Sequence, residues 1–174
     1  MSTAISIAHR RFIAMELAIG TVLGAVLPAI TMYFTMDPFP MAVSGPDGLL
    51  WFMAKNAFGM GTVMTLLMTL GVRLRVRKGT VPALPSSRES HGLLRIVPHS
   101  VLARAVLFGL AALAGPGLAS IIAASAFAGE SVDRLPFTFI MAAASALTAL
   151  FLIPAILICA LTDLAPPAST DLPG

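Results

Sequence analysis

The stretch LLWFMAKNAFGMGTVMTLLMTLGVRLRVRK, residues 49–78, decides the class of fold. It is apolar from Leu49 to Val72 except for Lys55 and Asn56, and it then ends in a run of basic residues. Its 24 mostly apolar residues, at a rise of about 1.5 Å each, make roughly 36 Å of helix, whereas the hydrocarbon core of a bilayer is about 30 Å thick. The stretch therefore predicts a transmembrane helix that stops at a cluster of cationic side chains.

The composition of the whole chain agrees with a membrane protein. Apolar residues make up 57% of the 174 residues and charged residues 11%, whereas soluble domains carry about 25% charged residues. The net charge of +3 does not indicate nucleic acid, because the basic residues flank apolar runs and lack interleaved aromatic residues. The single cysteine, Cys159, lies in an apolar run and excludes an intrachain disulfide or a multi-cysteine metal site.

Three more apolar runs predict an all-α polytopic fold. We expect one domain, residues 1–174, with four transmembrane helices in an antiparallel bundle. Gly115-Pro116-Gly117 should kink or break the third span, because proline removes a backbone hydrogen bond and glycine loosens the same turn. The predicted spans are residues 12–34, 49–72, 101–127 and 136–162, with a basic cytoplasmic loop at 73–98 and a flexible, proline-rich tail at 163–174.

Basic residues are distributed unevenly about these spans. Nine lie on one predicted side and two, Lys55 and Arg134, on the other. Because Lys and Arg next to spans stay in the cytoplasm, both termini should be cytoplasmic in a multi-pass protein of the bacterial inner membrane. The nine are Arg10, Arg11, Arg73, Arg75, Arg77, Lys78, Arg88, Arg95 and Arg104. Of these, Arg73, Arg75, Arg77 and Lys78 are the candidates for binding the anionic headgroups of the bilayer.

Ionisable residues inside the spans are candidate functional residues, because a charge in lipid is costly. Glu16 should lie about 6 Å into the core from the inner side, and Arg104 about 4 to 5 Å from the same side. These depths predict an interhelical ion pair between them. A second hypothesis is that Glu16 binds a proton or a cation.

A second polar group is predicted near the outer side. Lys55 should lie about 9 Å from that interface, too far from Glu16 to pair with it. Its long side chain can extend outward toward Asp37 or Asp47, with Asn56 beside it. These four residues form the predicted outer-leaflet polar site.

Two resemblances bear on function. Glu16 followed by Gly20-Thr21 resembles the first helix of small multidrug-resistance exporters, although the spacing is one residue longer and the chain much longer. That resemblance implies proton-coupled transport through Glu16. Over its full length, the chain is similar to uncharacterised four-helix membrane proteins of alphaproteobacteria, with residues 60–75 as the Met-, Thr- and Leu-rich second span that ends in Arg-x-Arg. This second resemblance implies no activity.

Small residues at four-residue spacing favour packing between helices over chemistry. They let helix backbones approach closely, and the pairs are Gly20 with Gly24, Ala57 with Gly61, and Ala142 with Ala146. No catalytic constellation, metal-ligand spacing or cofactor motif is visible in the sequence. We therefore expect a non-enzymatic accessory or assembly subunit of a membrane complex, or a homo-oligomer. The alternative is a small proton-coupled or cation transporter that uses Glu16, and an intramembrane or lipid-modifying enzyme is a residual alternative without named catalytic residues.

Overall fold

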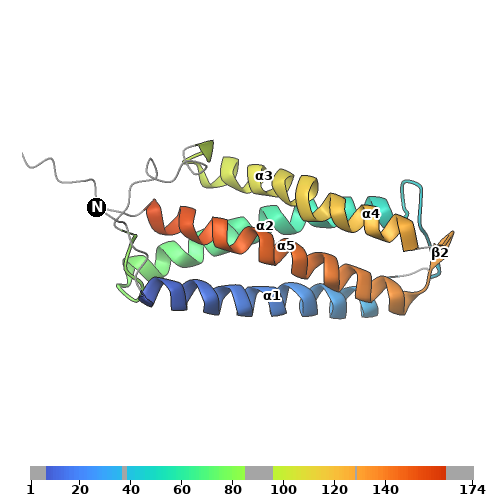
Figure 1. Ribbon diagram of the computed structural model, residues 1–174, viewed down its shortest axis with the longest axis horizontal. Helices are drawn as coiled ribbons and strands as arrows, with labels where there is room; N and C mark the ends of the chain where they lie inside the picture. Colours follow the sequence, from blue (N-terminus) through green and yellow to red (C-terminus); the bar gives the residue numbers. More distant parts are fainter. Residues whose placement is uncertain (1–6, 37–38, 85–95, 128, 164–174) are drawn as a thin grey trace, which may run out of the picture.

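Four long apolar helices make up the computed structural model, which describes residues 7–36, 39–84, 96–127 and 129–163 (Figure 1). They are α1 (Ile7–Thr35), α2 (Leu49–Arg77), a composite of α3 (Val101–Ala112), η3 (Leu113–Gly117) and α4 (Leu118–Phe127), and α5 (Arg134–Thr162). All four are long and apolar enough to cross a membrane. The predicted all-helical class is confirmed, and the chain is a multi-pass membrane protein.

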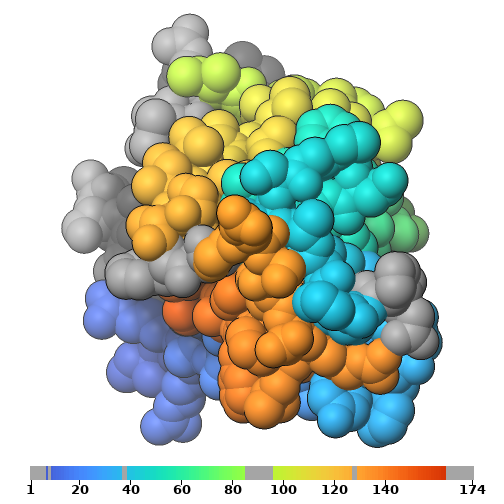
Figure 2. All heavy atoms as spheres, turned by 90° about the vertical axis from the view of Figure 1, so that its right-hand side faces the viewer, coloured from blue at the N-terminus to red at the C-terminus, as the bar shows by residue number. Residues whose placement is uncertain are grey.

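A short β-ladder, which the sequence did not predict, ties two connections together at one end of the helices. Strand β1 (Met41–Ala42) pairs antiparallel with β2 (Ser131–Val132), with Met41 opposite Val132. We call this end the strand end. Figure 2 looks onto it and shows the orange atoms of β2 and the start of α5 beside the cyan atoms that follow α1. The opposite end, where α1 and α3 begin and α2 and α5 finish, is called the charged end.

Helix α5 is the core of the molecule. It lies between α1 on one side and α2 and α3 on the other (Figure 1). In contrast, the most apolar window of α1 has no buried residues, so α1 packs along one face of α5 and leaves most of its surface to lipid. The buried residues of α5 recur at helical spacing in its first half and become almost continuous after Leu152: Phe137, Met141, Ser145, Thr148, Ala149, Leu152, Ile153, Ile156, Leu157, Cys159, Ala160, Leu161 and Thr162.

Glycines allow the helices to approach closely, as the four-residue spacing predicted. A Cβ atom on Gly61 would lie 2.7 Å from Ala112 Cβ and 3.0 Å from the Phe108 carbonyl oxygen, so α2 and α3 nearly touch there. Gly24 lies against Met60 and Ala149. In a membrane, where lipid tails solvate apolar side chains well, such close packing is a main source of helix association.

The interruption predicted at Gly115-Pro116-Gly117 takes the form of a π-helical turn, η3. Pro116 has no N–H group to donate, and its ring would collide with the carbonyl four residues earlier in a regular α-helix. The wider turn accommodates the ring, and π turns often mark functional places in helices. Gly117 is needed because a Cβ there would lie 2.8 Å from the Ala112 carbonyl oxygen. Beyond η3, the backbone of α4 stays close to α2 and not to α5.

Candidate functional site

The charged end holds a buried group of ion pairs centred on Asp163. Its Oδ2 lies 2.7 Å from Arg104 Nη2 and 3.0 Å from Arg73 Nη2. The Arg104 side chain is completely buried and also donates from Nε and Nη2 to the Pro98 carbonyl, at 3.3 and 3.2 Å. The cluster joins α2, α3 and the end of α5, and loss of one partner would leave a charge buried without compensation.

The predicted pair between Glu16 and Arg104 is therefore wrong. Asp163, the first residue of the predicted flexible tail, instead directly follows the last turn of α5 and pairs with the two arginines. Glu16 instead pairs with Arg75, whose guanidinium also lies 5.7 Å from the centre of the Phe12 ring. Arg75 was predicted to face headgroups, yet α2 presents it to α1. A role for Glu16 in proton or cation binding stays a prediction.

Of the four residues of the predicted outer polar site, the structure brings Lys55 and Asn56 together along one hollow on α2. Asp37 is outside the described residues, and Asp47 is exposed in the connection before α2. The Lys55 ammonium group lies 5.8 Å from the centre of the Trp51 ring, which is within the range of a cation–π contact. Asn56 donates from Nδ2 to Ser145 Oγ on α5, at 3.4 Å.

The four predicted headgroup-binding residues face three directions. Arg73 is turned inward to Asp163, and Arg75 is held by Glu16. Lys78 lines the same hollow beside α1 as Arg75 does, whereas Arg77 is exposed and does not line it. Alternate positions on a helix point to different sides, so a basic run at the end of a span does not form one surface.

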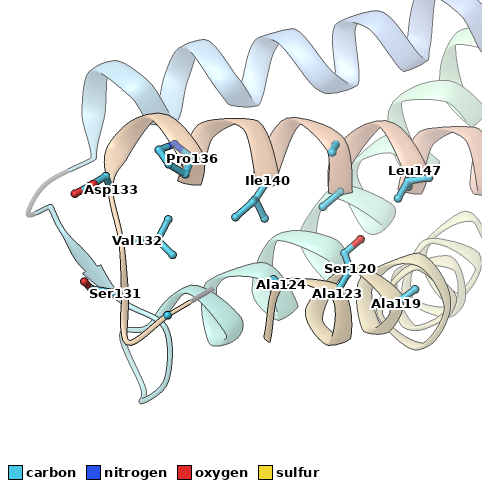
Figure 3. A pocket seen from close by; sticks show the side chains of 13 residues that line it. Ala119, Ser120, Ala123, Ala124, Ser131, Val132, Asp133, Pro136, Ile140 and Leu147 are labelled. Atoms are coloured by element: carbon cyan, nitrogen blue, oxygen red, sulfur yellow. The ribbon is translucent and has the colours of Figure 1, made fainter. Parts of the chain in front are cut away.

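A groove between α4 and α5 is the most distinctive cavity near the strand end. It has a volume of about 490 Å³ and exists because α4 diverges from α5 after η3. Figure 3 shows Ile140 and Val132 reaching into it from α5 and β2, opposite the small side chains of α4. Its lining consists largely of small or apolar residues: Ala119, Ser120, Ala123, Ala124, Gly129, Ser131, Val132, Asp133, Pro136, Ile140, Ala143, Ala144 and Leu147.

The groove is not among the features predicted from the sequence, although the sequence carries two signals for it. Gly115-Pro116-Gly117 indicated the divergence of the third span, and Ala142 with Ala146 indicated close packing on the fourth. The groove is lined instead by the neighbouring Ala143 and Ala144. The Ser120 hydroxyl is buried in its wall without a hydrogen-bond partner.

Metal chemistry finds little support in the described part of the chain. No three His, Cys, Asp or Glu residues among residues 7–36, 39–84, 96–127 and 129–163 lie close enough to share an ion. His9 is buried and its Nε2 lies 2.9 Å from the Pro82 carbonyl oxygen, which holds the start of α1 against the segment after α2. His91 lies outside the described residues.

No family model, no curated protein and no solved structure matches this chain.

Proposed function

We propose that this chain is a non-enzymatic accessory or assembly subunit, or a homo-oligomer, that holds a further transmembrane helix in the groove between α4 and α5. The helices form an antiparallel bundle in a bacterial inner membrane, with both termini in the cytoplasm. The observation that carries the proposal is the groove itself, which lies between two apolar helices and has small residues on both walls.

The walls have the residues that close helix contact requires. On α4, Ala119 with Ala123, and Ser120 with Ala124, stand four positions apart on adjacent rows, while Ala143 and Ala144 face them from α5. Small side chains let a third backbone come near, and its larger side chains then fill the space that α4 and α5 leave between them. The occupant we infer is an apolar helix with a ridge of aliphatic side chains.

Polar groups in the middle of the bundle support packing over transport. The hydroxyls of Thr62 and Thr65 donate to carbonyls of their own helix, at 2.8 and 2.6 Å. Glu16 lies near the charged end and is paired with Arg75. Transport of a proton or cation needs polar or ionisable side chains at successive depths of the membrane. Glu16, near the charged end, is far from Lys55 and Asn56, near the strand end, so these three residues do not form such a series.

Charge supports the orientation. The charged end carries four exposed basic residues and two arginines paired with Asp163. They are Arg10, Arg11, Arg77 and Lys78, and the half-buried Arg73 and buried Arg104. The positive-inside rule therefore favours a cytoplasmic charged end and places the groove in the outer half of the membrane.

Site-specific photocrosslinking in native membranes tests the helix partner. A small diazirine amino acid at Ala123, inside the groove, should yield a crosslinked protein, whereas the same probe at Ile122 is the matched control. Ile122 is on the same helix, is 60% exposed, and does not line the groove. The expected result is a discrete product at Ala123 that is absent or much weaker at Ile122.

The mass of the product identifies the partner. An increase of one chain, 18.1 kDa, indicates a homo-oligomer, and another fixed mass indicates a subunit of a complex. The substitution Ala143→Leu, which fills the groove from the opposite wall, should abolish either product. Adducts with lipid alone, or equal products at both probe positions, would overturn the proposal.

A further inference from the structure

A hollow of about 560 Å³ lies between the start of α1 and the segment that follows α2, at the charged end. Its lining includes three cationic side chains, Arg11 from α1 and Arg75 and Lys78 from the end of α2. We propose that this hollow, which we call the basic hollow, binds the phosphate headgroup of an anionic phospholipid.

The walls of the basic hollow suit an amphiphile. Phe12 and Met15 continue from Arg11 along α1, and Val81 and Pro82 close the hollow on the other side. Met15 is 51% exposed on the surface of a span, so the apolar part of the hollow is continuous with the lipid-facing surface of α1. A phospholipid has the same order of groups, a charged headgroup above an apolar chain.

The charges are complementary to a phosphate. Arg11, Arg75 and Lys78 supply three positive charges, and Glu16, which pairs with Arg75, removes one of them. The Glu16 carboxylate and the Phe12 ring also fix the guanidinium of Arg75 in place. The Arg75 position is therefore ordered before a ligand binds, which lowers the entropic cost of binding. Basic pockets between transmembrane helices are a known arrangement for acidic lipid headgroups.

The backbone keeps the hollow open. Thr80 Oγ1 donates to the Arg75 carbonyl at 2.9 Å, and Gly79 turns the chain with a φ of 70°. His9 Nε2 lies 2.9 Å from the Pro82 carbonyl oxygen. The first two contacts hold the segment after α2 against the end of that helix, and the third connects this segment to α1. The hollow is therefore a formed site and not a chance gap between two helix ends.

Other basic residues at this end serve as controls. Arg10 and Arg77 are exposed at the ends of the same two helices and do not line the hollow. A diffuse attraction to an anionic leaflet would use Arg10 and Arg77 as much as Arg11 and Lys78. A site in the hollow would instead depend on Arg11 and Lys78, beside Arg75, and not on Arg10 or Arg77.

Native mass spectrometry of the full chain, purified in an uncharged detergent and titrated with phosphatidylglycerol, tests the proposal. The double variant Arg11→Gln/Lys78→Gln should bind phosphatidylglycerol about 30-fold more weakly, since each basic residue near a charged lipid surface contributes about 1 kcal/mol. The double variant Arg10→Gln/Arg77→Gln, with the same change in net charge, should bind almost as the unaltered protein does. Arg11→Lys/Lys78→Arg should retain binding, which separates loss of charge from damage to the fold.

Three results would overturn the proposal. Equal losses in both Gln double variants would mean diffuse attraction, and no loss in either would mean that the hollow is not used. Displacement of the lipid by millimolar inorganic phosphate would identify a soluble phosphate as the ligand. The inference needs a membrane protein but no helix in the groove between α4 and α5, so the two proposals can fail separately.

Discussion

Replacing Gly61 by alanine tests whether the contact between α2 and α3 needs a residue without a side chain. The added Cβ would lie 2.7 Å from Ala112 Cβ, 3.0 Å from the Phe108 carbonyl oxygen and 3.1 Å from Gly109 Cα. Carbon atoms are at their optimal separation at about 3.5 to 4.0 Å. Because two of the three neighbours are backbone atoms, no side chain can rotate away, and the helices must separate by about 1 Å.

The loss of stability in Gly61→Ala can be measured against Gly59→Ala, a substitution in the same helix. Overpacking of this kind costs about 1 to 3 kcal/mol, whereas alanine gains up to about 1 kcal/mol over glycine in a helix interior. Gly59→Ala has the same helical gain, and nothing lies within 4 Å of its added Cβ. The difference between the two variants therefore isolates the close contact, and we expect Gly61→Ala to melt roughly 2 to 12 °C below Gly59→Ala.

The single cysteine provides the assay. Cys159 is fully buried in α5, so a maleimide dye that fluoresces on reaction with thiols reports the exposure of the core during heating in detergent. Gly59→Ala should melt at or slightly above the temperature of the unaltered chain. Equal melting temperatures for the two variants would refute the reasoning, because the helices would then have room to accept a methyl group at no cost.

Three further substitutions probe the charged end and the π turn. Asp163→Asn removes the carboxylate shared by Arg73 and the fully buried Arg104, and should lower the free energy of unfolding by about 3 to 5 kcal/mol. In the same thiol assay, a loss of stability no larger than that of the exposed-site control Asp47→Asn would contradict this. Glu16→Gln should change the free energy of unfolding by less than about 1 kcal/mol, since the Arg75 side chain is 47% exposed. If the unaltered protein carried protons across proteoliposomes and this variant did not, a transporter would be favoured over our proposal. Pro116→Ala restores a backbone N–H within η3 and should weaken photocrosslinking from the groove; an unchanged yield would show that other contacts hold α4 away from α5.

The sequence was sufficient for the helices and for several of their contacts. Apolar runs of more than 20 residues leave few alternatives to membrane helices, and the four-residue spacing of Ala57 and Gly61 identified a surface where helices meet. These features are local. The length of a run and the spacing within it need no knowledge of the neighbours.

The partners of the charged residues could not be predicted without knowing which helices are adjacent. Depth in the membrane placed Glu16 and Arg104 at similar levels, but depth does not say which helices are adjacent. Because α1 packs on α5 and not on α3, Glu16 meets the end of α2, and Arg104 meets Asp163 where α5 finishes. The groove likewise depends on the direction that α4 takes after a π turn, which a proline and two glycines permit but do not specify.

The helix that the others surround is also the last of the four in the chain. While the ribosome is still translating residues before Arg134, α1 has already entered the bilayer without the surface on which it packs. By then α2 and α3 can already pack on each other, whereas α1 has no helix to pack against. We expect α1 to join the other spans only when α5 arrives, so a product truncated before Arg134 should leave α1 dissociated from α2 and α3 in the membrane.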